Sequence, residues 1–239
     1  MQRTGQVTVL RSAEMPKFSI GLLMVMLVQV PASDRAVIAR YQVAIKSGAI
    51  EDAFNELSSL GQTLPRVMES LSDREFQQLQ GDLPGAIVNR EEVVLVEPDV
   101  DYFVKFAAAR GDVADRRFFA AFKITFTESV WPAYIEQQTD YSGCTAFGSG
   151  KLVETYRVWA QFQNDYPKRY ASAVRQELDR ISRELTDSTC ACGDLAAIQS
   201  ELQRFIRMFP SSSIRPKVEA RLNALRLGKS DIRVRCISG

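Results

Sequence analysis

The sequence contains no histidine, and this absence excludes several kinds of catalytic and metal site. Ser-His-Asp and Cys-His nucleophile systems use an imidazole as the general base, and many zinc sites use it as a ligand. No lysine follows a serine by three residues, which excludes the Ser-x-x-Lys arrangement of acyl-transfer enzymes. Gly148–Lys151 lacks the earlier glycine that a phosphate-binding loop needs. We therefore expect no cofactor, no metal and no catalysis.

Long hydrophobic runs are also scarce, and the clearest is Phe18–Val30 near the start of the chain. Three basic residues precede it, and Val30-Pro31-Ala32 follows it, which is the pattern of a secretory signal peptide. The run is shorter than the roughly 20 residues of a membrane-spanning helix. We expect residues 1–32 to be a signal peptide, with Met15 as a second candidate start. An uncleaved anchor or a buried core helix is the alternative.

A strong excess of charge is missing too, since 30 basic residues face 29 acidic ones. Bulk charge therefore indicates no nucleic acid or other polyanion as partner. The exception is the C-terminal end, where nine Lys or Arg follow residue 203, against Glu219 and Asp231. A solvated face or internal pairing explains such a cluster. The functional alternative is a dock for an acidic partner, for which the candidate residues are Arg215, Arg221 and Arg226.

Cysteine is rare, and all four cysteines lie after residue 143: Cys144, Cys190, Cys192 and Cys236. In an oxidising compartment an even number suggests two disulfides. A bond between Cys190 and Cys192 would close a very small ring, so we expect one of them to pair with Cys144 and the other with Cys236. A redox-active Cys190-Ala-Cys192 pair is the alternative reading.

What the sequence does have is helical periodicity. Apolar residues at three- and four-residue steps predict helices over 34–47 and 50–61, joined by a turn at Gly48. The first pair resembles a tetratricopeptide-type repeat, with small, glycine and proline residues at that family's spacing: Tyr41, Ala44, Gly48, Ala53, Leu57, Leu60 and Pro65. In this resemblance the small residues let the helices approach closely, and Pro65 ends the second helix.

The middle of the chain alternates between irregular and aromatic segments. Pro84 and Gly85 break the helical pattern, and a short strand is predicted near 92–97. Helices are expected again after Pro98 and after Gly111. Phe118, Phe122 and Phe126 share one helical face, which predicts packing core in preference to a ligand site.

Two later segments echo each other, because Phe162 and Pro167 each have a counterpart 43 residues on, at Phe205 and Pro210. This aromatic-proline hinge between helices is similar to periplasmic tetratricopeptide-like assembly proteins. Repetition on this scale predicts stacked helical hairpins. The expected fold is therefore all-α, an α-solenoid over residues 33–239 with a sub-boundary in the glycine-rich loop 139–150.

One enzymatic alternative remains. Glu128-Ser129, followed by a glycine-rich segment at Gly148, resembles the acid and downstream motif of lysozyme-like lytic transglycosylases. The resemblance implies Glu128 as a general acid in an apolar pocket supplied by Phe126 and Trp131. A solvated glutamate at a helix end is the simpler explanation.

These patterns together favour an exported helical scaffold, in a periplasm or secreted. Its expected partner is a protein or peptide of the cell envelope, bound to a surface built by successive helix pairs. Cleavage of peptidoglycan through Glu128 is the alternative function.

Overall fold

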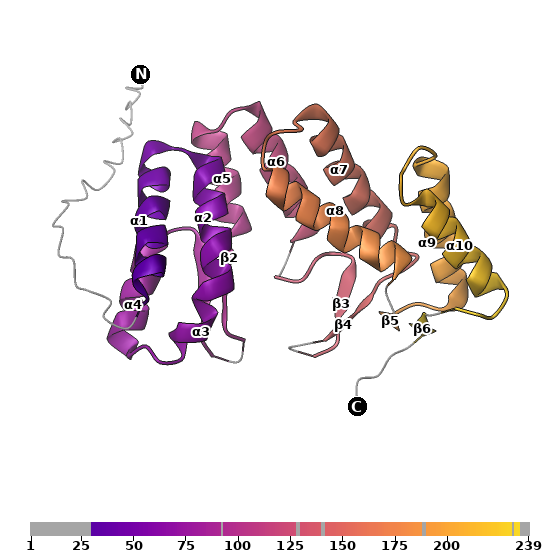
Figure 1. Ribbon diagram of the computed structural model, residues 1–239, viewed down its shortest axis with the longest axis horizontal. Helices are drawn as coiled ribbons and strands as arrows, with labels where there is room; N and C mark the ends of the chain where they lie inside the picture. Colours follow the sequence, from indigo (N-terminus) through magenta and orange to yellow (C-terminus); the bar gives the residue numbers. More distant parts are fainter. Residues whose placement is uncertain are drawn as a thin grey trace, which may run out of the picture.

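The computed structural model describes residues 30–91, 93–127, 130–139, 142–187, 190–230 and 232–234. The fold is mainly helical and is built from hairpin-like helix pairs, as the sequence predicts, but it also contains two small sheets. The expectation of an all-α fold is therefore corrected. Figure 1 shows the helix pairs following one another along the long axis of the molecule.

The first pair consists of α1 (Ala32–Ser47) and α2 (Ile50–Thr63), which pack against each other. Gly48 joins them with φ 80°, a left-handed conformation that glycine adopts without steric cost. The predicted turn is thus confirmed. α2 ends at Thr63 with Leu64 as its C-cap, directly before Pro65, as expected, and Pro65 then begins the short helix α3 (Pro65–Met68).

A capping box begins α4 (Asp73–Asp82). The Glu75 amide donates to Ser72 Oγ, and the Ser72 amide donates to Glu75 Oε2 at 3.0 Å. An antiparallel hairpin follows, made of β1 (Ala86–Asn89) and β2 (Leu95–Pro98). It confirms a strand in the region near 92–97, although Glu92 lies outside the described residues.

The hairpin packs on α2 through a close backbone approach at Gly61. A Cβ atom at this position would lie 2.6 Å from the carbonyl oxygen of Val96, so only glycine fits without movement of β2. This contact fixes the position of Glu97, the next residue of β2, relative to α2.

The aromatic core lies between α5 (Val100–Arg110) and α6 (Val113–Thr125) and extends into the neighbouring helices. Phe103 and Phe119 are fully buried and stack with centroids 5.1 Å apart. Phe118 is equally buried and contacts Trp159 edge to face. The packing role predicted for Phe118 and Phe122 is confirmed, since both are buried, and Phe126 packs against the same core while partly exposed.

The last four helices form the two pairs that the sequence echo predicts. They are α7 (Lys151–Asp165) with α8 (Ala171–Thr186), and α9 (Leu195–Met208) with α10 (Arg215–Arg226). Phe162 and Phe205 are both buried, and Tyr166 and Phe209 end the first helix of each pair with similar backbone angles.

A four-stranded sheet lies beside these pairs, in the order β3 (Ile135–Gln137), β4 (Gly143–Thr145), β5 (Cys190–Ala191) and β6 (Arg233–Val234). A disulfide joins Cys144 to Cys192 with a Cα–Cα distance of 5.2 Å. The predicted outward pairing of Cys192 is thus confirmed, and no Cys190–Cys192 pair forms. Cys190 is also disulfide-bonded, and Cys236 lies outside the described residues.

In the described part of the chain, no helix is both long and apolar enough to cross a membrane. The hydrophobic run up to Gln29 lies outside that part, so the signal peptide stays a prediction. Val30 is 1 % exposed, and its carbonyl oxygen accepts a hydrogen bond from Arg35. Cleavage before Ser33 would therefore remove the buried side chain of Val30. The disulfide is consistent with an oxidising compartment.

Candidate functional site

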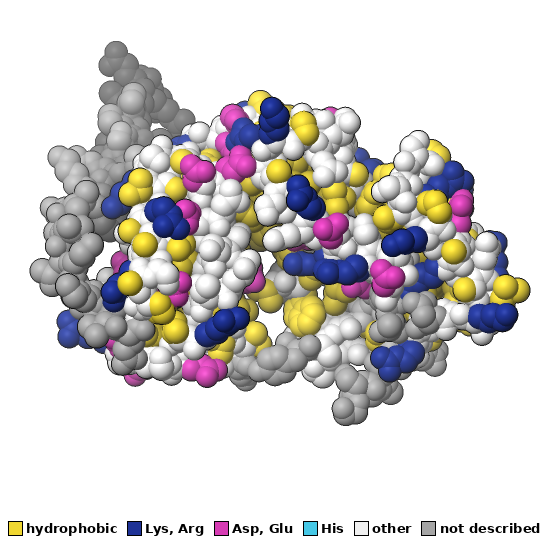
Figure 2. Space-filling model, viewed as in Figure 1, with side chains coloured by type: hydrophobic (Ala, Val, Ile, Leu, Met, Phe, Trp, Pro, Cys, Tyr) yellow, Lys and Arg dark blue, Asp and Glu magenta, His cyan; other side chains and the backbone are white. Residues whose placement is uncertain are grey.

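A cleft of about 340 Å³ separates the α2 and β2 side of the molecule from α8, and we call it the central cleft. Figure 2 shows it as a hollow near the middle of the molecule, with hydrophobic side chains at its bottom. Five of the described residues that line it are aromatic, namely Phe54, Phe118, Phe122, Phe126 and Trp159.

The cleft has two facing walls. Gln62 of α2 and Ile87 of β1 lie on one side, and Ala173 and Gln176 of α8 lie on the other. Ile87 is 42 % exposed, an apolar side chain open to solvent at the cleft. An aromatic floor with open walls is the usual form of a small binding site.

Glu177 of α8 is the unusual residue of the cleft. It occupies a position in the buried stripe of α8 between Val174 and Ile181, and it is only 7 % exposed. Its Oε2 atom is buried and has no hydrogen-bond partner among the described residues. Its Oε1 atom lies 3.5 Å from Nη1 of Arg180, one turn further along the helix. A buried carboxyl oxygen without a partner destabilises the fold and therefore calls for a functional explanation.

A second carboxyl group, that of Glu97, lines the same cleft from β2. It reaches water, but surrounding protein atoms remove part of its hydration and raise its pKa, while Arg180 opposes this shift. Burial also raises the pKa of Glu177, and the nearby charge of Glu97 raises it further against the effect of Arg180. Perturbed carboxyl groups gathered in a cleft are typical of functional sites.

Glu201 of α9 provides an internal comparison, because it is 1 % exposed and fully partnered. Its carboxylate accepts hydrogen bonds from the amides of Gly148 at 3.1 Å, Gly150 at 2.9 Å and Val153 at 3.1 Å. It thereby satisfies the free amides at the start of α7. Glu201 has a complete structural role, whereas Glu177 does not.

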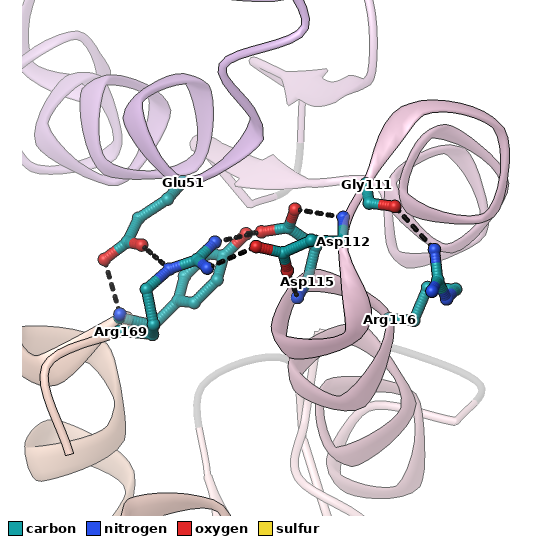
Figure 3. A network of polar contacts seen from close by, with 7 residues as sticks. Glu51, Gly111, Asp112, Asp115, Arg116 and Arg169 are labelled. Carbon is teal, nitrogen blue, oxygen red and sulfur yellow. Dashed lines mark hydrogen bonds and ion pairs between the residues drawn. The ribbon is translucent and has the colours of Figure 1, made fainter. Parts of the chain in front are cut away.

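A polar network joins the two sides of the central cleft, and we call it the Arg169 clamp (Figure 3). The Arg169 guanidinium contacts three carboxylates at 2.6 Å each: Glu51 at the start of α2, and Asp112 and Asp115 at the start of α6. These contacts raise the pKa of Arg169, with Asp112 as the largest cause. The clamp therefore ties the loop before α8 to α2 and α6.

The clamp continues into the floor of the cleft through Tyr170. This residue donates a hydrogen bond from its hydroxyl to Asp115 at 2.7 Å, and its ring stacks on Phe118 with centroids 3.8 Å apart. Tyr170 has φ 49°, a left-handed conformation that is uncommon for a residue other than glycine. The two walls are thus connected by the ion pairs of Arg169 and by the hydrogen bond and ring stacking of Tyr170.

The three arginines proposed as a dock all lie on α10 but differ in exposure. Arg221 is 6 % exposed, and its Nη1 donates to the carbonyl oxygen of Glu184 at 2.8 Å, so it is not available to a partner. Arg215 pairs with Glu219 at 2.9 Å. Arg226 is exposed. Docking through Arg215 and Arg226 stays a prediction.

Of the residues proposed for glycan cleavage, the structure describes Phe126 and Trp131. Phe126 lines the central cleft, whereas Trp131 lines a separate hollow of about 610 Å³ beside Lys151 and Arg204. Glu128 lies outside the described residues. The apolar pocket expected around Glu128 therefore stays a prediction.

Sequence reasoning did not single out Glu97, Glu177 or Arg180. The signal for Glu177 was present, because a glutamate interrupts the apolar positions Val174 and Ile181 at helical spacing. Glu201 gives the same signal in α9 and has a structural explanation. The pattern therefore predicts a buried carboxyl group but does not indicate whether its oxygens have hydrogen-bond partners.

Comparison with known proteins gives no relative: no protein-family model matches the chain, and no significant match exists among curated proteins or solved structures. The site is therefore interpreted from its own chemistry.

Proposed function

We propose that the protein is an exported helical scaffold that binds an extended peptide segment of an envelope protein in the central cleft. One observation carries this proposal: the cleft combines an aromatic floor with a buried carboxyl oxygen, on Glu177, that has no partner among the described residues. Interior carboxyl groups without a partner are costly, so a ligand that completes the hydrogen bonding explains the arrangement.

The dimensions and walls of the cleft favour a peptide. A volume of about 340 Å³ matches a small ligand or a few side chains of a chain segment. The apolar residue Ile87 and the polar residues Gln62 and Gln176 line it together, and this mixture suits a backbone with alternating side chains.

The test is photocrosslinking from inside the cleft. The exposed side chain of Gln176 is replaced by p-benzoyl-phenylalanine in the mature chain, which is then irradiated with an extract of its own envelope. Gln77, an exposed glutamine of α4 that lines none of the described hollows, provides the matched control.

We expect the Gln176 variant to crosslink to one recurrent segment of one partner, mapped by mass spectrometry. A synthetic peptide of that segment should suppress the crosslink. Equal yields from both positions, or adducts only with glycan, would contradict the proposal.

A further inference from the structure

We propose that the bound segment presents a lysine or arginine to the central cleft, with its cationic group held by Glu177 and Glu97 and its aliphatic stem on the aromatic floor. This inference rests on the proposed function and specifies the chemistry of the ligand.

The charges of the cleft carry the argument. Among the described residues that line it, Glu97, Glu177 and Arg180 are the charged ones, so two carboxylates face one guanidinium. Arg180 approaches Oε1 of Glu177 and leaves Oε2 without a partner. A second cation in the cleft balances the remaining negative charge of the two carboxylates.

The aromatic floor suits the same ligand. Arg180 already lies over the ring of Phe126, with its guanidinium carbon 6.0 Å from the ring centroid. Cations gain from contact with aromatic faces, more strongly when they are partly desolvated. A long side chain with an apolar stem and a charged end therefore matches both the floor and the carboxyl groups.

Proton release is expected to accompany binding. Two charged groups act on Glu177: Arg180 on the same helix and Glu97 on β2. The charge of Glu177 in turn acts on the buried Tyr134, which precedes β3. Burial raises the pKa of Glu177 and partial removal of water raises that of Glu97, so in the unbound protein both carboxyl groups hold a proton more readily than ordinary glutamates. A cation favours the ionised carboxylates and displaces that proton.

The experiment uses two defined probes, acetyl-Phe-Lys-Phe-amide and acetyl-Phe-norleucine-Phe-amide, which differ only in the charged end of the central side chain. Binding to the mature chain is measured by NMR titration and by calorimetry in two buffers of different ionisation enthalpy. Glu177→Gln tests the buried carboxylate, and Glu69→Gln, an exposed glutamate outside the cleft, is the matched control.

We expect the lysine peptide to bind about tenfold more tightly than the norleucine peptide, with release of protons. Glu177→Gln should remove most of this preference, whereas Glu69→Gln should keep it. Equal binding of both peptides to the native chain would overturn the inference and leave the proposed function standing.

Binding of neither peptide at millimolar concentration would also overturn the inference. In that case the crosslinks from position 176 decide the proposed function independently, because they require no assumption about charge. Displacement of the peptides by a murein oligosaccharide with higher affinity would overturn both.

Discussion

Arg169 and Glu51 are 118 residues apart in the sequence, yet Nε of Arg169 lies 2.6 Å from Oε2 of Glu51. This ion pair connects the loop before α8 to the start of α2. Residues of α8 and α2 line the opposite walls of the central cleft. The same guanidinium also contacts α6, whose phenylalanines form much of the floor. The Arg169 side chain thus connects the segments that form the two walls and the floor of the candidate site.

Replacing Arg169 by glutamine should destabilise the fold, because Asp115 is largely buried and would lose its cation. We expect the free energy of unfolding to fall by about 2 kcal/mol, measured by urea denaturation. Arg157→Gln is the matched control, since Arg157 pairs with Glu154 at a more exposed site, where such pairs contribute about 0.5 kcal/mol. Equal losses would contradict the clamp.

Replacing Glu177 by glutamine should stabilise the protein at neutral pH, by about 1 kcal/mol. Burial raises the native pKa of Glu177 above its ordinary 4.5, so the native state holds the proton more tightly than the unfolded state. The native protein therefore loses stability as the pH rises from about 4.5 through the raised pKa. The difference between the urea denaturation midpoints at pH 4.5 and pH 7.5 should be smaller for Glu177→Gln than for the parent protein. A destabilised variant at pH 7.5 would show that Glu177 has a structural role.

Asp112 should have the opposite pH dependence. The amide of Asp115 and then the guanidinium of Arg169 lower its pKa below the ordinary 3.8. The stability that ionised Asp112 contributes to the folded state is therefore present at neutral pH and is lost as the pH falls below about 4. Asp112→Asn should reduce the loss of stability between pH 5 and pH 2.5, measured by thermal unfolding. An unchanged slope over this range would contradict the assignment.

Gly61→Ala should destabilise the protein by about 2 kcal/mol, because the new Cβ meets the Val96 carbonyl oxygen and displaces β2. Gly81→Ala in α4 is the matched control, since its new Cβ meets nothing within 4 Å beyond its own helix backbone. Alanine favours a helix, so the control should be neutral or gain up to about 1 kcal/mol. Thermal unfolding compares the two, and a neutral Gly61→Ala would rule out the close approach.

Loss of the Cys144–Cys192 bond should cost about 2 to 4 kcal/mol, because the bond closes a loop of 48 residues in the unfolded chain. The double variant Cys144→Ala, Cys192→Ala avoids leaving a free thiol and should melt at a lower temperature than the parent. Alkylation of the native protein without reductant should leave both cysteines unmodified. Ready alkylation of Cys144 would contradict the disulfide.

The helix pairs could be predicted from the sequence because each has a local signal. Gly48 sets the first turn, Ser72 and Glu75 form a capping box, and the echo between Phe162 and Phe205 marks the last two pairs. The four-stranded sheet gives no such signal. Its strands have two or three residues, too few to show alternation, and their pairing depends on distant segments and a disulfide.

The candidate site was harder to predict than the fold. Glu97 and Glu177 are 80 positions apart, and only the tertiary packing of β2 and α8 brings them to one cleft. Phe118, Phe122 and Phe126 of the aromatic floor could be assigned to core packing from their helical spacing, and that prediction is correct for Phe118 and Phe122, which are buried. Periodicity does not tell which edge of such a core remains open.

The most direct test of the central claim is to fill the cleft. Gln176→Trp places a large side chain at its wall, and Gln77→Trp adds the same side chain to an exposed position of α4. We predict that the partner segment identified by crosslinking loses at least tenfold in affinity for the Gln176→Trp protein and binds the Gln77→Trp protein as it binds the parent. Equal affinity for both variants would contradict binding in the cleft.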